Sequence, residues 1–573
     1  MVYVPPISRA EFVQYLQKCM PPRGWPERLV VANSGGPDST CLLYLLSSLV
    51  KEKRRSPGLP RTILSVHVNH KLQDAAREMA DIAESNAGRF GVQHVSTEIH
   101  WGVRPFMQRP PSRTLERDAR RARMRVLHDT MISMKSSCVA FAQHADDQVE
   151  TSILRLANGS SSFGASGMRH IRRLGMGGLS EVEHFGQTGL NFFAIRPLLE
   201  ISKDRIYATC KANNLRYATD PTNFQPHVTL RNRLRQILSQ PETFNVMNKS
   251  TPEQSQPVDP EVPSDWPQGL MWADPEDQER LLRGTIVKLA SQADIGHDGR
   301  PNLYSAVSKM NAHVRMVETK TTNLITAMAL PSPPSTLFFS VDDLRKIEEH
   351  ELRISFVRRI LRYVSPYPWG HPSAEAHGNR LALNDIAQKI WCNEKETSPR
   401  GFSPGSGVLA WPVVIRPDGQ VRSREPEPED RRAWFFQRQP AFSVERLRRL
   451  GKSNPLFIDI TANLQSLRWK GQPSLDVIYD NRFLVRIRVA DLPKNLLPSL
   501  DDPGLKGTVV LEPDTKYFLP QLLWRRVGSK DHSLAKVVLD SKRGGNNFMV
   551  GPAALKVNVP WVRISQIRPI DDI

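Results

Sequence analysis

Cysteine is scarce in this chain, and no apolar run is long enough to cross a bilayer. The five cysteines are spread over 573 residues without a C-x-x-C pair. This argues against a disulfide framework and against a local cysteine zinc site, and favours a reducing compartment. The longest mostly apolar run, Cys41 to Val50, is far shorter than the roughly 20 residues of a membrane-spanning helix. We therefore expect a soluble protein without a membrane partner.

Negative charge is also in short supply. Lysine and arginine number 78 against 59 aspartates and glutamates, which gives a formal net charge of +19. Such an excess favours an anionic macromolecular partner, with a generic basic surface as the alternative. The chain is too long for one ordinary hydrophobic core, so we expect two or three domains.

Apolar runs alternate with helical patterns over residues 1–240. The predicted strands are 29–32, 62–67, 93–97, 138–143 and 191–195, and the predicted helices are 39–50, 74–89, 114–129 and 146–157. This alternation predicts an α/β fold with a doubly wound, mostly parallel, five-stranded sheet. Ligands of such sheets bind beyond the carboxyl ends of the strands.

The remaining chain divides by composition into three segments. Residues 241–267 contain six prolines and predict an irregular linker. Residues 268–400 are expected to be mainly helical, and residues 401–573 to form a mixed, β-rich C-terminal module. Within that module, residues 477–485 predict a hairpin with an Asp-Asn turn.

The stretch VVANSGGPDSTCLL, residues 30–43, lacks the lysine of a Walker phosphate loop. A strand, a glycine-rich turn and a helix start can nevertheless bind an anion through backbone N–H groups. Gly35 and Gly36 would allow close approach, and Ser34 and Ser39 add hydroxyl groups. Asp38 beside a phosphate indicates a divalent metal. The alternative is a tight turn whose polar side chains only cap the helix.

Two further helices carry candidate chemistry. Residues 143–155, QHADDQVETSILR, place Asp147 and Glu150 on one helix face. Such carboxylates suit Mg²⁺ binding or removal of a proton from an amine, although an acidic first turn is also common at solvated helix starts. Residues 114–125, TLERDARRARMR, predict a basic helix whose arginines suit phosphate recognition or a solvated face.

The words S-G-G-P-D-S at 34–39 resemble the PP-loop of ATP pyrophosphatases. Together with H-A-D-D-Q-V-E-T at 144–151, R-P-L-L at 196–199, D-P-T-N at 220–223 and R-N-R-L-R at 231–235, they make residues 28–238 resemble the tRNA(Ile)-lysidine synthetase family. The chain departs from the family pattern at Asn69 and Lys71, where Asp and Gly are usual.

The resemblance implies a ligase that works in two steps. ATP would adenylate the C2 oxygen of the wobble cytidine in a tRNA(Ile) with a CAU anticodon, and the amine of free L-lysine would then displace AMP. The product, lysidine, converts AUG to AUA decoding. By motif position, the implied ATP-binding residues are Ser34, Gly35, Gly36, Pro37, Asp38 and Ser39, with Asp38 also carrying Mg²⁺. The implied catalytic residues are Asp38, Arg120, Arg123, Asp147 and Glu150, and the implied tRNA-binding residues are Arg231, Arg233 and Arg235.

Several points stay open at this stage. The alternatives within the superfamily are a PP-loop tRNA thiolase and a catalytically inactive ATP- and RNA-binding paralogue. The C-terminal module is a candidate for further tRNA contact, and a homodimer is an open alternative to a monomer. For the compartment we expect the mitochondrion or the cytoplasm, with a preference for the mitochondrion.

Overall fold

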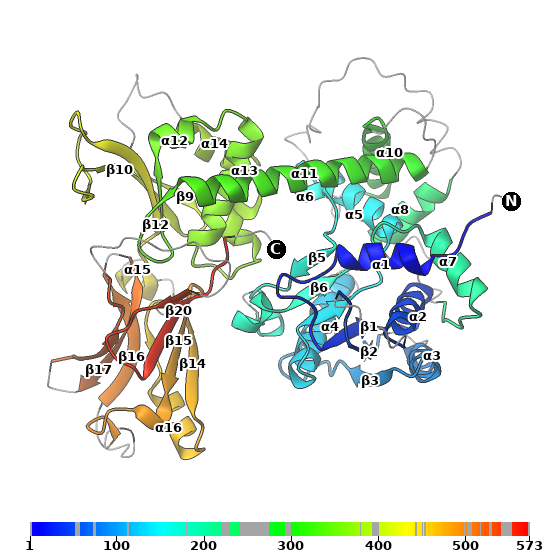
Figure 1. The fold of residues 1–573 in the computed structure, drawn as a ribbon, viewed down its shortest axis with the longest axis horizontal. Coiled ribbons are helices and arrows are strands. Elements are labelled where there is room, and N and C mark those ends of the chain that lie inside the picture. Colours follow the sequence, from blue (N-terminus) through cyan, green and yellow to red (C-terminus); the bar gives the residue numbers. More distant parts are fainter. Residues whose placement is uncertain are drawn as a thin grey trace. The chain divides into compact units, whose positions relative to one another are not determined.

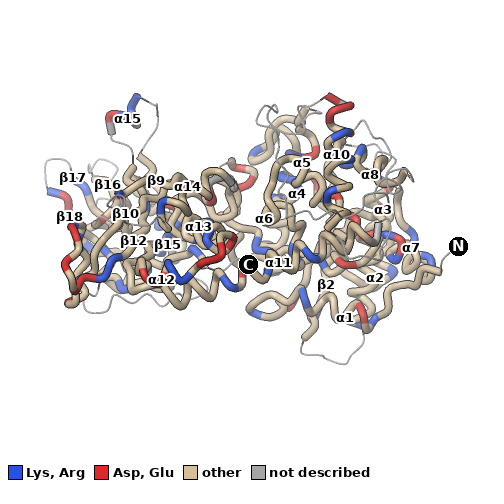
Figure 2. Tube along the Cα trace, turned by 90° about the horizontal axis from the view of Figure 1, so that it is seen from above, with Lys and Arg blue, Asp and Glu red and all other residues tan. Residues whose placement is uncertain are grey.

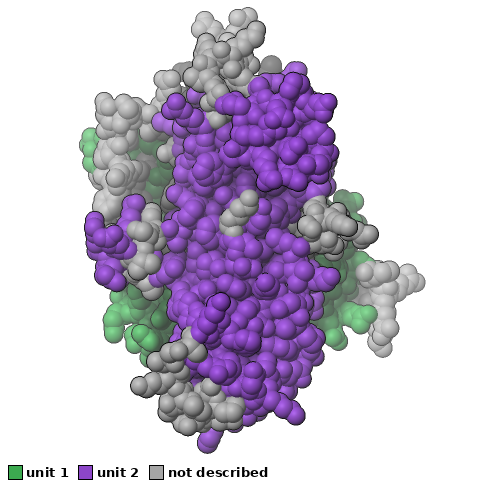
Figure 3. All heavy atoms as spheres, turned by 90° about the vertical axis from the view of Figure 1, so that its left-hand side faces the viewer, with its two compact units in different colours: residues 1–316, 573 green, residues 317–572 purple. Residues whose placement is uncertain are grey.

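The computed structural model divides the chain into two compact units, residues 1–316 and residues 317–572 (Figure 3). It describes residues 3–51, 58–72, 76–111, 114–178, 180–219, 229–240, 274–292, 300–378, 380–391, 400–441, 444–449, 451, 454–497, 500, 507–515, 517–526, 530–539 and 553–570. The predicted linker at 241–267 and the D-P-T-N motif at 220–223 lie outside these residues. Lysine and arginine are spread over both units (Figure 2).

The first unit is built on a six-stranded sheet in the order β3-β2-β1-β4-β6-β5 (Figure 1). Its strands are β1 (Arg28–Ala32), β2 (Thr62–Asn69), β3 (Gln93–Glu98), β4 (Cys138–Ala140), β5 (Ile171–Arg173) and β6 (Phe193–Ile195). All neighbouring strands run parallel except β5, which is antiparallel to β6. The prediction of a doubly wound, mostly parallel α/β sheet is confirmed.

The sixth strand corrects the expected count of five. β5 comes from the segment that precedes β6, and three residues are too few to show the alternation that identifies a strand. Its pairing is held by Arg173, whose buried guanidinium donates 2.7 Å to the carbonyl of Leu190 and lies over the ring of Phe193. Tertiary contacts therefore create a strand that local pattern does not indicate.

Helices cover both faces of this sheet because its strands are apolar on both sides. On one face Leu29 and Val31 pack with α1 (Arg9–Gln17), α2 (Pro37–Lys51) and α7 (Lys203–Ala212). On the other face Val30 packs with α4 (Leu115–Ser133). α3 (Ala76–Arg89) packs along β2 and β3. Of the helices that the structure describes, none combines the length and apolar character needed to cross a membrane.

A helical layer extends the first unit beyond the sheet. α5 (Ala145–Ala157) buries Val149 and Ile153 against α8 (Leu230–Ser239), α10 (Pro275–Ala290) and the first part of α11 (Arg300–Met328). The unit boundary therefore falls inside α11, and the helical segment expected at 268–400 is divided between the two units. The reason is that the apolar face of α10 is buried against α5 rather than within a separate helical domain.

The second unit contains three antiparallel sheets. The first has the order β11-β10-β12-β8-β7 with β9 on β10, and comprises β7 (Ala329–Leu330), β8 (Leu337–Ser340), β9 (Phe402–Gly405), β10 (Val408–Ile415), β11 (Val421–Arg422) and β12 (Arg431–Arg438). Helices α12 (Val341–Arg345), α13 (His350–Val364) and α14 (Arg380–Trp391) accompany it. Since β8 pairs with β12, this unit begins well before residue 401, where the C-terminal module was expected.

Two four-stranded sheets share one hydrophobic core in the last part of the chain. Their orders are β13-β16-β17-β18 and β14-β15-β20-β19. The strands are β13 (Ile458–Asp459), β14 (Ser474–Tyr479), β15 (Phe483–Arg488), β16 (Gly507–Asp514), β17 (Leu519–Arg526), β18 (His532–Lys536), β19 (Ala553–Leu555) and β20 (Val562–Gln566), with helices α15 (Val444–Arg449) and α16 (Thr461–Trp469). The predicted hairpin is confirmed: Asp480 and Asn481 form the turn between β14 and β15 with φ of 53° and 50°.

Buried ion pairs brace the second unit. The carboxylate of Glu375 lies 3.0 Å from Arg358 Nη2 and 2.7 Å from Arg362 Nε. Burial would raise the pKa of Glu375, but these two guanidinium groups lower it to about 2. These two ion pairs therefore favour the folded state at every pH at which Glu375 is ionised.

We predict that Glu375→Gln lowers the free energy of unfolding at neutral pH by about 3 kcal/mol, because the buried Arg362 and the partly buried Arg358 lose this carboxylate. Since the pKa of Glu375 in the folded protein lies below its ordinary value of 4.5, this difference from the wild type should be constant above that value and shrink as the pH falls toward 2. Urea unfolding followed by tryptophan fluorescence at a series of pH values measures it. A difference that grows toward acid pH would contradict the assignment.

Candidate active site

The glycine-rich turn lies between β1 and α2, at the carboxyl end of a central strand. Gly35 has a φ of +79°, and a Cβ atom built on it would lie 2.4 Å from the carbonyl oxygen of Met79. A side chain at this position would therefore both strain the backbone and collide with α3. At Gly36 an added Cβ would meet only Ser34 Oγ, at 3.5 Å.

Short polar contacts hold the turn in place. Ser39 Oγ accepts a hydrogen bond from the N–H of Ser34 at 3.2 Å, lies 3.1 Å from Ser34 Oγ and donates to the carbonyl of Gly36 at 3.1 Å. Asn33 Oδ1 accepts from the N–H of Gly35 at 3.0 Å. These hydrogen bonds fix the conformation of the turn, with both serine hydroxyls at its centre.

A cavity of about 760 Å³ opens from this turn. Its walls come from the turn itself, α5, α7, α8 and α11, which are far apart in the sequence. Of the residues predicted from the sequence, Ser34, Gly36, Pro37, Asp38, Arg123, Asp147, Glu150 and Arg235 line it. The structure therefore brings the loop and the acidic helix to one site.

His144 joins the carboxylates of this cavity. Its Nε2 atom lies 3.5 Å from Asp147 and 3.8 Å from Asp38, and its Nδ1 atom lies 3.5 Å from Asp146. Burial would lower the pKa of His144, but Asp147, Asp146 and Asp38 together raise it. The imidazole is therefore stabilised in its charged form, in contact with all three carboxylates.

Lys203 is a cavity residue that the sequence analysis missed. It is the first residue of α7, and its ammonium group forms an ion pair with Asp38 Oδ1. Its backbone N–H also donates to Asp146 Oδ2 at 2.9 Å. A cation thus reaches this loop from a helix 165 residues further along the chain, a separation that no local pattern could reveal.

Tyr304 also reaches the cavity from a distant segment. Its hydroxyl, on α11, donates to Asp146 Oδ1 at 2.9 Å. Burial alone would raise the pKa of Asp146, but the hydrogen bonds from His144, the Lys203 N–H and Tyr304 lower it. Asp146 is therefore held as a carboxylate that orients its neighbours.

The three arginines predicted to bind tRNA lie on α8, and two of them contact Glu150. Arg235 pairs with Glu150 through two bonds of 2.7 and 3.0 Å and lies 3.4 Å from Asp147. Arg231 Nε lies 3.4 Å from Glu150, and Arg233 bonds to Gln278. Arg231 and Arg235 therefore neutralise a carboxylate that is only 4% exposed.

Arg123, predicted to be catalytic, lies on α4 and lines the cavity. Its Nε atom is buried and has no hydrogen-bond partner among the residues that the structure describes. Burial, together with the neighbouring Arg120, lowers the pKa of Arg123 to about 10. Arg120, one turn earlier, is exposed and does not line the cavity.

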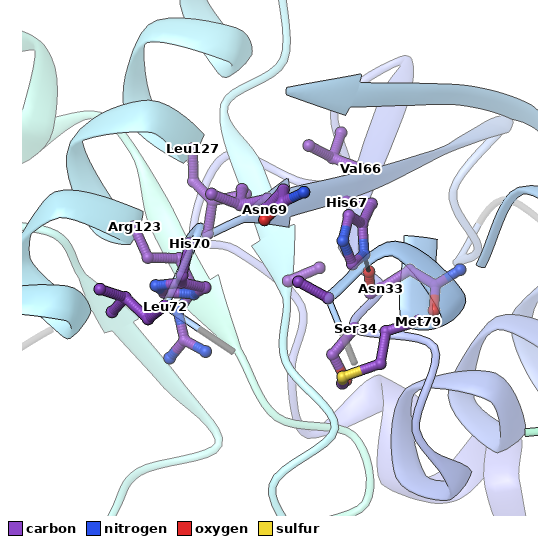
Figure 4. Close-up of a pocket in the computed structure, with 13 residues that line it drawn as sticks. Asn33, Ser34, Val66, His67, Asn69, His70, Leu72, Met79, Arg123 and Leu127 are labelled. Atoms are coloured by element: carbon purple, nitrogen blue, oxygen red, sulfur yellow. Dashed lines mark hydrogen bonds between the residues drawn. The ribbon is translucent and has the colours of Figure 1, made fainter. Parts of the chain in front are cut away.

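A smaller cavity of about 90 Å³ adjoins the turn at the ends of β1 and β2 (Figure 4). His70 and Arg123 lie close together in it, and burial lowers the pKa of His70 to about 4, helped by Arg123. Asn69, one of the family departures, accepts from the N–H of Lys71 at 2.8 Å, where Lys71 has a φ of 52°. Asn69 and Lys71 therefore build the turn after β2.

The described side chains also show how far the structure supports a metal site. Across the described ranges, no group of three or more His, Cys, Asp or Glu side chains is arranged to hold a metal ion. Asp38, the predicted Mg²⁺ ligand, is instead paired with Lys203. This arrangement still suits Mg²⁺, which commonly takes one or two protein carboxylates and completes its shell with water and substrate phosphates.

The fold and the loop define the class of this first unit. Residues 9–242 match the family model of the PP-loop domain, so this part of the chain is similar to PP-loop domains. The sequence relatives of this domain narrow the resemblance further. It is 31% identical over 233 residues to a tRNA(Ile)-lysidine synthase of Methylobacterium nodulans, covering 41% of this chain and 59% of that protein. It is also 31% identical over 210 residues to the one of Bacillus subtilis, covering 37% and 39%.

These matches confirm the resemblance seen in the motifs, and they cover less than two thirds of those relatives' own lengths. Among solved structures, a U34-tRNA thiolase, NcsA, from Methanococcus maripaludis is 16% identical with a TM-score of 0.29, covering 42% of this chain and 83% of that one. A likeness of that size supports no statement about function.

We predict that Gly35→Ala lowers the free energy of unfolding of the first unit by about 1–3 kcal/mol, because the left-handed backbone and the Met79 carbonyl both exclude a methyl group. Gly36→Ala is the matched control, since its added methyl meets only the Ser34 hydroxyl at an ordinary contact distance. Thermal unfolding of the two variants measures the effect. Equal melting temperatures would contradict the clash.

Proposed function

We propose that this protein is an ATP-dependent ligase that attaches lysine to C2 of the wobble cytidine of tRNA(Ile) with a CAU anticodon. The observation that carries this proposal is one cavity in which the PP-loop faces the carboxylates of α5. Support also comes from the 31% identity of this domain to tRNA(Ile)-lysidine synthases. The proposed product is lysidine, with AMP and pyrophosphate released.

In the first step, the C2 oxygen of cytidine attacks the α-phosphorus of ATP, and the bond to pyrophosphate breaks. The hydroxyls of Ser34 and Ser39 and the N–H groups at the start of α2 would hold the pyrophosphate. Asp38 would hold Mg²⁺, with Asp147 near it across His144. When bound, Mg²⁺ supplies charge neutralisation at the leaving phosphates. Arg123, whose Nε atom lacks a partner, is placed to contact the α-phosphate.

Lys203 would act with the PP-loop in this step. Asp38 would hold Mg²⁺, and the ammonium group of Lys203, which pairs with the same carboxylate, would lie next to the phosphates. An ammonium group is a suitable point charge for phosphate. The loop would thereby gain a cation without carrying a lysine in its own sequence.

In the second step, the amine of lysine attacks C2, a proton leaves the nitrogen, and AMP departs with the C2 oxygen. Glu150 suits the removal of that proton, because burial raises its pKa against the opposing pull of Arg235. Asp147, bound to the N–H of His144 at 3.2 Å, would orient the ammonium group of lysine. The cavity therefore offers carboxylates for a dibasic amino acid and cations for phosphates.

The proposal extends to the substrates, the oligomeric state and the compartment. Free L-lysine and tRNA(Ile) with a CAU anticodon are the proposed substrates, bound by a monomer or a homodimer. The activity belongs where AUA codons are read by an isoleucine tRNA, and we prefer the mitochondrion over the cytoplasm.

We predict that the protein, mixed with ATP, Mg²⁺, radiolabelled lysine and tRNA(Ile) with a CAU anticodon, forms labelled lysidine that is recovered after digestion to nucleosides. Asp38→Ala should abolish this product because it removes the proposed Mg²⁺ ligand. Asp81→Ala, at an exposed position of α3, is the control and should retain it. A thiolated nucleoside, formed when a sulfur donor is supplied, would favour a thiolase. ATP binding without any modified nucleoside would favour an inactive paralogue.

We predict that Lys203→Gln raises the KM for ATP about tenfold, equivalent to about 1.4 kcal/mol of lost binding, because a phosphate loses its cationic partner. Lys211→Gln removes an exposed lysine from the same helix and should leave the KM unchanged. Steady-state kinetics at saturating tRNA and lysine measure both. An unaltered KM for ATP in Lys203→Gln would show that Lys203 serves only to balance Asp38.

A further inference from the structure

Four arginines gather beside the cavity, at the sheet edge that carries the PP-loop. Arg196 directly follows β6, and Arg120, Arg155 and Arg172 come from α4, α5 and β5. We call these four residues the arginine cluster. Their guanidinium groups lie close enough to repel one another: burial lowers the pKa of Arg196 to about 9, and Arg172, Arg120 and Arg155 add to the effect. None of the four lines the cavity of about 760 Å³.

Arg155 and Arg196 of this cluster donate hydrogen bonds to neutral oxygen atoms and not to carboxylates. Arg155 is exposed and donates from Nη1 to the carbonyls of Gly164 and Gly167, both at 3.0 Å. Arg196 is 6% exposed and donates to the side chain of Gln143 and, at 2.9 Å, to the carbonyl of Arg169. Within the described part of the chain, neither Arg155 nor Arg196 has a carboxylate partner. Their bonds fix the guanidinium planes and leave the positive charges uncompensated.

Other arginines of the same region are paired differently. On α4, Arg121 lies 2.5 Å from Glu183 and Arg125 lies 2.8 Å from Asp129. On α8, Arg235 is paired with Glu150. The chain thus places acids beside arginines that it neutralises, so the uncompensated charge of Arg155 and Arg196 is a local property of this region and not of the basic composition alone.

We infer that the arginine cluster binds backbone phosphates of the RNA substrate next to the reacting nucleotide. This inference rests on the proposed function for the identity of the substrate. The shared chemistry is a phosphate group, which either ATP or RNA could supply. RNA is favoured because the cluster lies outside the cavity, and because a polyanion can meet several separated guanidinium groups at once. The main RNA contact of this domain would then lie at the cluster, while Arg231 and Arg235 serve Glu150.

The test is the salt dependence of tRNA binding. Arg155→Gln should weaken binding of tRNA(Ile) several-fold at low salt and reduce the slope of log affinity against log salt by about one, as expected for one lost phosphate contact. The dissociation constant for ATP, measured without tRNA, should not change. Arg89→Gln is the matched control: Arg89 is exposed, lies at the end of α3 and also donates to backbone carbonyls, at 2.8 and 3.5 Å.

Each outcome decides the inference. Loss of ATP affinity in Arg155→Gln would assign the cluster to the nucleotide, and an unchanged salt slope would remove it from RNA binding altogether. If Arg155→Gln fails to fold by circular dichroism, Arg120→Gln, at an exposed position, must show the reduced slope instead. A wild-type protein that binds tRNA through the cluster but forms no lysidine would overturn the proposed function and leave this inference standing.

Discussion

The site depends on charge pairing inside a cavity from which water is partly excluded. Asp38 meets the ammonium group of Lys203, and Asp147 meets the imidazole of His144 at the start of its own helix. Glu150, which is only 4% exposed, meets the guanidinium group of Arg235. The first pair joins α2 to α7, the last joins α5 to α8, and His144 also lies 3.8 Å from Asp38, which links the two sets at the carboxyl edge of the sheet. The packing of the helices and the electrostatics of the site therefore depend on each other, because moving one of these helices would separate a charge from its partner.

Charge pairing also stabilises the second unit. The turn between β14 and β15 points its aspartate inward, where Asp480 bonds to Arg438 at 2.7 and 3.0 Å and to Arg482 at 2.7 Å. This links the hairpin to β12 of the neighbouring sheet. Breaking one partner of such a buried network costs far more than an exposed pair, since it leaves the other charge desolvated.

Sequence pattern predicted the parts of the fold that are local. The turn at 34–36, the acidic first turn of α5 and the five parallel strands each depend on residues close together in the chain, where propensity and periodicity act directly. It did not predict β5, whose three residues pair only because the edge of β6 is available. Nor did it place the unit boundary inside α11, because periodicity shows that a helix has an apolar face but not which partner covers it.

The sequence by itself determined the chemistry of the PP-loop. Gly35 is there because the backbone is left-handed beside the Met79 carbonyl, and Ser34 and Ser39 contact each other within one turn. Only the tertiary structure decided how the charges are completed. Lys203 and Tyr304 come from α7 and α11 to bind Asp38 and Asp146, and Arg235 of α8 meets Glu150. Ion pairing in a cavity depends on distance in space, and no spacing along the chain encodes it.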